Sequence, residues 1–226
     1  MSRPSTPRRE QTRQRLATAA TELIAERGMS ASTVELICDR AGFTRGAYYS
    51  AFGSREELYR AVLEVNQDLQ RQWIRQSTTT LAELLATRPD LLTGPIAERL
   101  AVAAEVSLGL HGGDEFPLGP GGPDPWTIAA LVPIELALYA VREPESRPLF
   151  LATQTEMHEE LGAFVISLAE LLGLRVAVDR QQAGVALQSV VLAVARRAMT
   201  FDTAPAQVLS VRLAQLLGCL VGGGED

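Results

Sequence analysis

The sequence has no lysine, only two cysteines and two histidines, and few aromatic residues. Cys38 and Cys219 lie far apart with no second cysteine near either, which argues against a zinc cluster or a disulfide framework. His111 and His158 are also far apart, and no H-E-x-x-H, G-x-S-x-G or P-loop motif occurs. These absences give an enzyme little support, and we expect no metal or cofactor site.

Long hydrophobic runs are also absent. The residues before Gln14 are polar and arginine-rich, unlike a signal peptide, and the longest apolar run, 128–141, is shorter than a bilayer span and contains Glu135. The 226 residues are 46% hydrophobic and 21% charged, which is enough to bury a core and too apolar for disorder. We therefore expect a folded cytoplasmic protein without a membrane partner.

Positive charge is concentrated at the start of the chain. The net charge is -6, yet residues 1–60 carry ten arginines against seven acidic residues, a balance of +3 that leaves -9 in the remainder. Only the front of the chain therefore suits a polyanion such as DNA. All 21 basic residues are arginine, which reflects either bidentate phosphate and base contacts or the codon usage of a GC-rich genome.

Helical spacing dominates the sequence. No strand-like alternation bounded by turns occurs, whereas apolar residues recur every three or four positions, so we predict an all-α fold. Ten of the nineteen residues in Ser107–Pro125 are glycine or proline, which predicts a long loop of the kind that often forms a lid or a binding loop. The longer helices are predicted over roughly 55–86, 95–110, 125–141, 146–173, 180–200 and 205–221.

Two shorter helices are predicted before these. The first ends at Gly28, and the second opens with a capping box in which Ser32 is the N-cap and Glu35 is at the third helical position, and ends at Gly42. The apolar stripe of the first helix consists of Leu16, Ala19, Ala20, Leu23 and Ile24.

A third and a fourth helix follow at once. Thr44 can cap a very short helix that reaches Tyr49, and a second capping box at Ser54 opens the long fourth helix. Two short helices joined by a tight glycine turn form the unit that lays its second helix in the major groove of DNA. Arg45, at the start of that helix, can fork onto guanine.

The segment from Thr12 to Leu63 resembles the N-terminal domain of the tetracycline-repressor (TetR) family. The residues that carry the resemblance are Leu16, Ala19, Ala20, Leu23, Glu26-Arg27-Gly28, Thr33, Ile37, Ala41-Gly42, Gly46-Ala47, Tyr49, Phe52, Ser54 and Glu57-Leu58. The resemblance implies that Thr33 and Tyr49 hold the DNA backbone and that Arg55 grips a phosphate. It also implies that the groove is faced by Thr44, Arg45, Gly46, Ala47 and Tyr48.

The residues themselves leave alternatives to some of these roles. Tyr49 and Phe52 can both be core aromatics, and Arg55 can be a solvated charge in a first helical turn. Tyr48 stands where leucine is more typical of the family. The arginines at the very start of the chain can follow a minor groove or belong to a disordered tail.

The resemblance implies a division of the chain into three parts. Residues 1–9 form a flexible basic arm, and residues 10–55 form a three-helix helix-turn-helix DNA-binding domain. A long helix joins this domain to a C-terminal α-helical domain, residues 56–226, for ligand binding and dimerisation.

Two apolar stripes near the C-terminus predict a dimer interface. A single recognition helix reads few base pairs, so such proteins normally dimerise to engage two half-sites. In TetR-like proteins the last two long helices form this interface as a four-helix bundle. The alternative is that the stripes belong to the core of one chain. The candidate interface residues are Leu187, Val190, Val194, Leu209, Leu213, Leu216, Leu217 and Leu220.

Polar residues within the apolar stripes of the middle helices indicate where an effector could bind. Each of them has the alternative role of a satisfied buried polar group. The scarcity of charge on these stripes favours an apolar or aromatic small molecule. The candidate pocket residues are Trp73, His111, Trp126, Glu135, Gln154 and His158.

Together these features predict a TetR-like repressor that binds a palindromic operator in double-stranded DNA as a homodimer and is released by a small-molecule effector. The rival interpretations are an all-α carrier or enzyme that uses only the C-terminal domain, and a ligand-independent DNA-binding protein. The salt dependence of DNA binding distinguishes the predicted regulator from a carrier or enzyme, because binding to DNA releases counterions and weakens steeply as salt is added.

Overall fold

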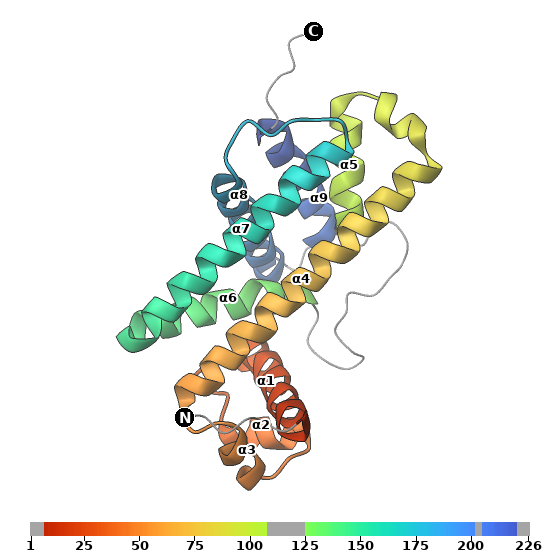
Figure 1. The fold of residues 1–226 in the computed structure, drawn as a ribbon. Helices are drawn as coiled ribbons and strands as arrows, with labels where there is room; N and C mark the ends of the chain where they lie inside the picture. Colours follow the sequence, from red (N-terminus) through yellow and green to blue (C-terminus); the bar gives the residue numbers. More distant parts are fainter. Residues whose placement is uncertain (1–6, 108–124, 202–204, 221–226) are drawn as a thin grey trace. The chain divides into compact units, whose positions relative to one another are not determined.

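The computed structural model describes residues 7–107, 125–201 and 205–220, apart from some side chains near helix ends. Every regular element in these ranges is a helix (Figure 1), which confirms the predicted all-α fold. The α-helices are α1 (Pro7–Arg27), α2 (Val34–Ala41), α3 (Arg45–Ala51), α4 (Arg55–Thr87), α5 (Ile96–Ser107), α6 (Pro125–Arg142), α7 (Arg147–Leu171), α8 (Arg180–Phe201) and α9 (Pro205–Leu220).

The longer predicted helices begin and end within a few residues of the observed ones, whereas the first helix, predicted to be short, has 21 residues. The sequence patterns missed two short 3-10 helices, η1 (Pro89–Thr93) and η2 (Pro144–Ser146), each of which begins with a proline. Helix α1 begins at Pro7, so the end of the predicted flexible arm is helical. The interior of the predicted glycine- and proline-rich loop, with His111, lies outside the described residues. No helix in the described ranges is long and apolar enough to span a membrane.

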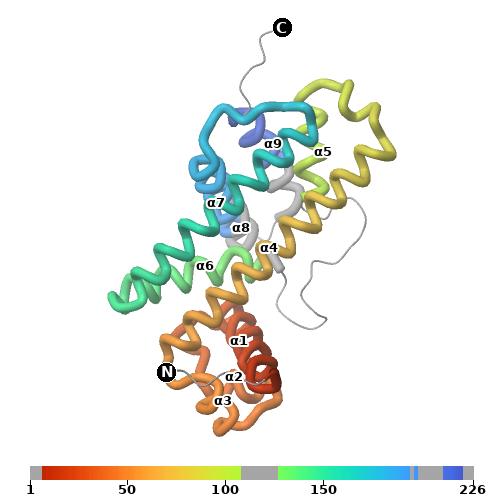
Figure 2. Tube along the Cα trace, viewed as in Figure 1, coloured from red at the N-terminus to blue at the C-terminus, as the bar shows by residue number. Residues whose placement is uncertain are grey.

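The chain folds into two compact units. One consists of Met1–Leu69 with Gly119–Thr153, and the other of Gln70–Leu118 with Gln154–Asp226. The first unit therefore holds α1 to α3, the start of α4, and α6, while the second holds the rest of α4, α5, most of α7, α8 and α9 (Figure 2). The predicted functional boundaries after residues 9 and 55 remain predictions.

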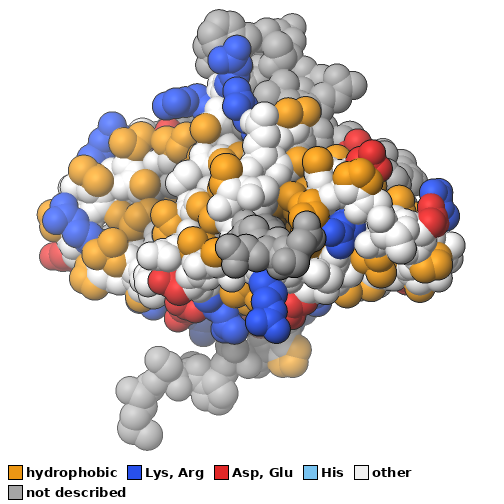
Figure 3. Space-filling model, turned by 90° about the horizontal axis from the view of Figure 1, so that it is seen from above, with side chains coloured by type: hydrophobic (Ala, Val, Ile, Leu, Met, Phe, Trp, Pro, Cys, Tyr) orange, Lys and Arg blue, Asp and Glu red, His pale blue; other side chains and the backbone are white. Residues whose placement is uncertain are grey.

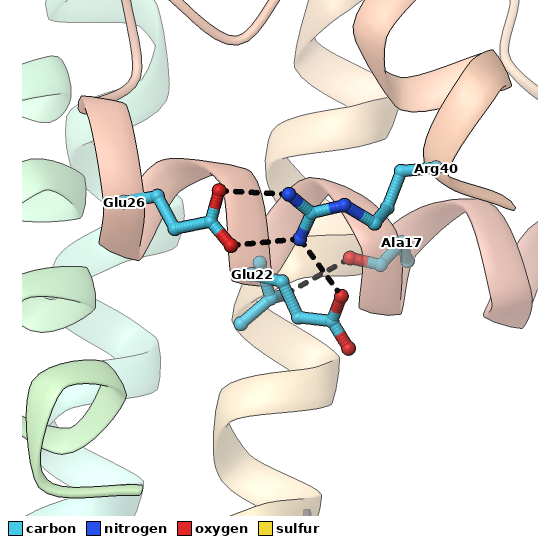
Figure 4. A network of polar contacts seen from close by, with 5 residues as sticks. Ala17, Glu22, Glu26 and Arg40 are labelled. Carbon is cyan, nitrogen blue, oxygen red and sulfur yellow. Dashed lines mark hydrogen bonds and ion pairs between the residues drawn. The ribbon is translucent and has the colours of Figure 1, made fainter. Parts of the chain in front are cut away.

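The first unit is built around the apolar face of α1, whose predicted stripe is fully buried. Ile37 of α2 and Phe52 after α3 are buried with it. On the outer side, Arg40 of α2 binds two carboxylates of α1 (Figure 4). It donates to both oxygens of Glu26 at 2.9 and 2.7 Å and to Glu22 at 3.2 Å, which fixes α2 against α1.

The second unit has one large apolar core. Its buried residues come from α4, α5, α7, α8 and α9, and the most completely enclosed include Leu81, Leu168, Leu187 and Leu213. Where the face drawn in Figure 3 is coloured, basic and acidic side chains are scattered among hydrophobic and neutral ones.

The helix caps differ in detail from the predicted ones. Thr33, not Ser32, is the N-cap of α2: its hydroxyl accepts from the Leu36 N–H at 3.4 Å. The Ser32 hydroxyl instead donates to the carbonyl of Gly28 at 2.9 Å, so it closes the end of α1. Thr33 has the extended backbone that is typical of an N-cap residue, so Thr33 and not Ser32 caps the helix.

Candidate nucleic-acid interface

The turn between α2 and α3 is held by its own backbone and by an arginine from α1. Gly42 lies at a φ of +70°, and the N–H of Phe43 donates to the carbonyl of Cys38 at 2.9 Å. Arg15 donates to the carbonyl of Ala41 at 3.0 Å, and its guanidinium carbon lies 4.7 Å from the centroid of the Phe43 ring. These contacts fix α2 and α3 in the helix-turn-helix arrangement that the sequence predicts.

Helix α3 presents its first residues to the surface. The Thr44 hydroxyl caps the helix by accepting from the Ala47 N–H at 3.2 Å, as predicted. Thr44, Arg45 and Gly46 are exposed and Ala47 is half-buried. These four predicted groove residues therefore lie where a DNA major groove could approach them.

The two tyrosines of α3 point in different directions, which corrects one expectation. Tyr49 is 64% exposed, whereas Tyr48 is only 5% exposed and its ring lies 5.4 Å from that of Phe52. Tyr48 packs against Phe52, which follows the end of α3, and most of its side chain is therefore in the core, although it also borders the hollow beside α3. Burial raises the pKa of the Tyr48 hydroxyl.

The first unit has a surface hollow of about 360 Å³ beside α3. Three residues to which the resemblance gives a role at the DNA backbone line it together: Thr33, Tyr49 and Arg55. The starts of α2 and α4 both open onto it, because Thr33 and Ser54 cap these helices. Hydroxyl groups, helix N-termini and a guanidinium are the groups that bind phosphate in proteins.

A further residue at this surface was not predicted to have a functional role. Glu35, in the first turn of α2, forms an ion pair of 2.5 Å with Arg45 at the start of α3. Hydrogen bonds from its own backbone N–H and from the Thr33 hydroxyl, together with Arg45, hold the pKa of Glu35 below its usual range. The sequence pattern predicted only a capping role for Glu35, because the ion pair of Glu35 with Arg45 depends on how α2 and α3 are folded together.

The fold is shared with proteins of known structure. A putative TetR-family transcriptional regulator from Rhodococcus sp. superimposes with a TM-score of 0.60 at 18% identity, over 94% of this chain and all of that one. The multidrug binding protein EbrR, in a structure complexed with imidazole, matches with a TM-score of 0.50 and 22% identity over the full length of both chains. At these identities the likeness establishes the fold alone.

Residues 16–62 match the family model of the bacterial regulatory proteins of the tetR family. The match covers the whole of α2 and α3 and the hollow between residues 30 and 58. Residues 16–62 are therefore a segment of the tetR-family type. The curated proteins that match part of this chain are likewise named as transcriptional regulators.

Curated relatives match about a third of this chain. The HTH-type transcriptional regulator SrpR of Pseudomonas putida is 40% identical over 67 residues, which are 30% of this chain and 32% of SrpR. The HTH-type transcriptional activator FasR of Mycolicibacterium smegmatis is 36% identical over 75 residues, 33% of this chain and 34% of FasR. The chain thus spans about a third of the length of the relatives it matches.

The predicted effector residues of the second unit form two separate groups. Trp73 donates from its indole N–H to the carbonyl of Ser107 at 2.7 Å, and its ring meets that of Phe164 at a centroid distance of 4.8 Å. Gln154 and His158 meet on Gln188 of α8, which was not predicted. Gln188 donates to Gln154 at 3.3 Å, and its amide oxygen forms a short hydrogen bond with the His158 ring.

Three further candidate effector residues remain. Glu135 accepts a hydrogen bond from the N–H of Met29 at 2.8 Å, within the first unit, so its carboxylate closes the turn after α1. The side chain of Trp126 and all of His111 lie outside the described residues.

The candidate dimer residues are divided between core and surface of the single chain. Leu187, Leu213, Leu217 and Leu220 are buried in the chain's own core, so they have little surface to offer a partner. Val190 and Leu216 are half-buried, and the side chains of Val194 and Leu209 lie outside the described residues. The alternative weighed from the sequence, an intrachain core, therefore holds for the four buried leucines. The exposed apolar residues of these helices include Val185 and Val211.

Proposed function

We propose that this chain is a DNA-binding transcriptional regulator that places α3 in the major groove of DNA. The observation that carries the proposal is the hollow beside α3, which brings Thr33, Tyr49 and Arg55 together next to exposed Arg45. The hollow supplies the donors for a backbone phosphate, and Arg45 can read the edge of a guanine. The matched segments of SrpR and FasR, which are named as transcriptional regulators, support the same function.

The regulator acts as a homodimer in this proposal. Because one recognition helix reads few base pairs, two copies are needed to engage the half-sites of a palindromic operator. The outward faces of α8 and α9, with exposed Val185 and Val211, form the interface in place of the buried leucines. Light scattering should give the mass of a dimer for the wild type and a smaller mass for Val211→Arg; a wild-type monomer at micromolar concentration would contradict the proposal.

Ligand-controlled repression completes the proposal. A small apolar or aromatic molecule binds among the helices of residues 56–226 and weakens the affinity of residues 10–55 for the operator, in the cytoplasm where the DNA is. The structural likeness to EbrR, a multidrug binding protein that forms a complex with imidazole, supports this class of ligand. In a reporter strain, deletion of the regulator should raise transcription from the operator; a fall would assign it to activators such as FasR.

DNA binding is tested by selection from a pool of randomised duplexes, followed by mobility shift with the enriched sequence. We expect an inverted repeat to be enriched and bound in a salt-sensitive manner. Arg45→Ala should weaken binding about 5- to 150-fold, the value of one bidentate base contact. Arg88→Ala is the matched control, because Arg88 is an exposed arginine of the second unit that pairs with Asp90. If a folded wild type enriches no sequence, the proposal is wrong.

A further inference from the structure

Helix α6 contacts two segments that contribute residues to the hollow, through side chains one helical turn apart. Glu135 and Tyr139 lie four positions apart, so they share one face of α6. Within the first unit, Glu135 contacts the turn that follows α1, and Tyr139 contacts the start of α4. Both segments supply residues to the rim of the hollow.

One rim is the turn that follows α1. The Glu135 carboxylate accepts the N–H of Met29 at 2.8 Å, and it lies so close to Gly28 that a Cβ there would meet a carboxylate oxygen at 3.3 Å. Ser30 and Ser32, the next residues along this turn, line the hollow. Glu135 therefore fixes the backbone that leads into the start of α2.

The other rim is the start of α4. The guanidinium carbon of Arg55 lies 5.4 Å from the centroid of the Tyr139 ring, within the range of a cation–π contact. Arg55 is exposed and lines the hollow. A guanidinium that rests its face on a ring keeps its N–H groups, which lie in its plane, free for phosphate oxygens.

The Tyr139 ring is itself held in place. It stacks on the ring of Tyr59 at a centroid distance of 4.6 Å. Tyr59 is fully buried, and its hydroxyl donates to the carbonyl of Leu136 in α6 at 3.1 Å. Movement of α6 would therefore carry the Tyr139 ring, and with it the support of Arg55.

We propose that Tyr139 is a positioning residue for DNA binding: its ring holds Arg55 at the hollow, so that the placement of α6 sets the strength of a backbone phosphate contact. This inference rests on the proposed DNA binding.

A double-mutant cycle on the selected operator tests the proposal. Dissociation constants are measured by fluorescence anisotropy at several salt concentrations for wild type, Tyr139→Leu, Tyr139→Phe, Arg55→Ala and the double variant Tyr139→Leu/Arg55→Ala. We expect Tyr139→Leu to weaken binding about two- to fivefold and Tyr139→Phe, which keeps the ring, to bind as the wild type does. In the Arg55→Ala background, Tyr139→Leu should have no further effect.

The salt dependence separates positioning from simple loss of structure. Arg55→Ala should reduce the slope of log K against log salt by about 1.8 for the dimer, the loss of one phosphate contact in each subunit, and Tyr139→Leu should reduce it in part. Leu138→Ala, at an exposed neighbour on α6, is the matched control and should leave both affinity and slope unchanged.

Either of two results would overturn the inference. Equal weakening by Tyr139→Leu with and without Arg55 would show that the ring acts on the fold and not on the arginine. A wild type that binds no duplex would overturn the proposed function as well, so the two failures are distinguishable. Circular dichroism melts accompany each variant, and Tyr139→Met replaces Tyr139→Leu in the cycle if the leucine variant does not fold.

Discussion

The close crossing of α7 and α8 gives a sharp test of the second unit. The two helices meet at glycines: a Cβ added to Gly184 of α8 would overlap the carbonyl oxygen of His158 in α7 and lie 2.7 Å from its carbonyl carbon. It would also lie 3.0 Å from the backbone nitrogen of Gly162. All of these atoms are backbone atoms, so no side chain can rotate away, and Gly184→Ala must push the helices apart.

The magnitude follows from two opposing effects. Forcing one extra carbon into a close-packed interface costs about 1–3 kcal/mol, and we expect the upper end because both neighbours are backbone. Alanine in place of glycine within a helix returns about 1 kcal/mol. The net loss of stability is therefore about 2 kcal/mol, which for a chain of this size lowers the melting temperature by about 4–8 °C.

The assay is urea unfolding followed by circular dichroism, at one fixed protein concentration because dimerisation would add to the apparent stability. Gly218→Ala is the matched control: it also lies within a helix, but its new Cβ would meet only Leu100, at 3.7 Å, an ordinary contact. We expect the control to be as stable as the wild type or more so. If Gly184→Ala unfolds at the same urea concentration as Gly218→Ala, the crossing is not as close as described and the reasoning fails.

Three further outcomes are expected from the first unit. Hydrogen bonds from Arg40 lower the pKa of Glu26 from its ordinary value of 4.5, so the pair stabilises the fold above that pH and loses its effect as pH falls through the lowered pKa. Arg40→Met should therefore reduce stability by about 0.3–1 kcal/mol at pH 7 and by less near pH 3, and a pH-independent difference in urea unfolding would count against the pair. Thr44→Ala should lose about 1 kcal/mol by removing the cap of α3, whereas Thr44→Ser should not, as thermal melts can show. Tyr59→Phe removes the hydroxyl that donates to the Leu136 carbonyl and should cost about 0.5–1.5 kcal/mol in urea unfolding; an unchanged midpoint would mean that this bond contributes little.

Much of this protein could be predicted from the sequence because helices are local structures. The stripe from Leu16 to Ile24, the turn at Gly42 and the caps at Thr44 and Ser54 are each decided within a few residues, and the structure has all of them. The resemblance of this segment to the TetR family then indicated the regulatory class. A local error, the choice of Ser32 over Thr33 as a cap, arose because two hydroxyl side chains stood side by side.

The tertiary structure decided what could not be read locally. Periodicity places Tyr48 and Tyr49 on different faces of α3, but only packing against Phe52 shows which face is inside. The leucines of α8 and α9 follow the same pattern whether they face a partner or their own chain, and the structure buries Leu187 and Leu213 in their own chain.

The contacts of α6 depend most of all on the tertiary fold. Glu135 lies far from its partner Met29 in the sequence, and Tyr139 lies far from its partner Arg55. Nothing in the local pattern of these residues identifies the partners. The sequence by itself determined where most of the longer helices lie and which residues share a face, since these follow from hydrogen bonds and contacts between near neighbours. Which faces meet depends on how all the apolar surfaces are buried at once, and only the folded chain satisfies that condition.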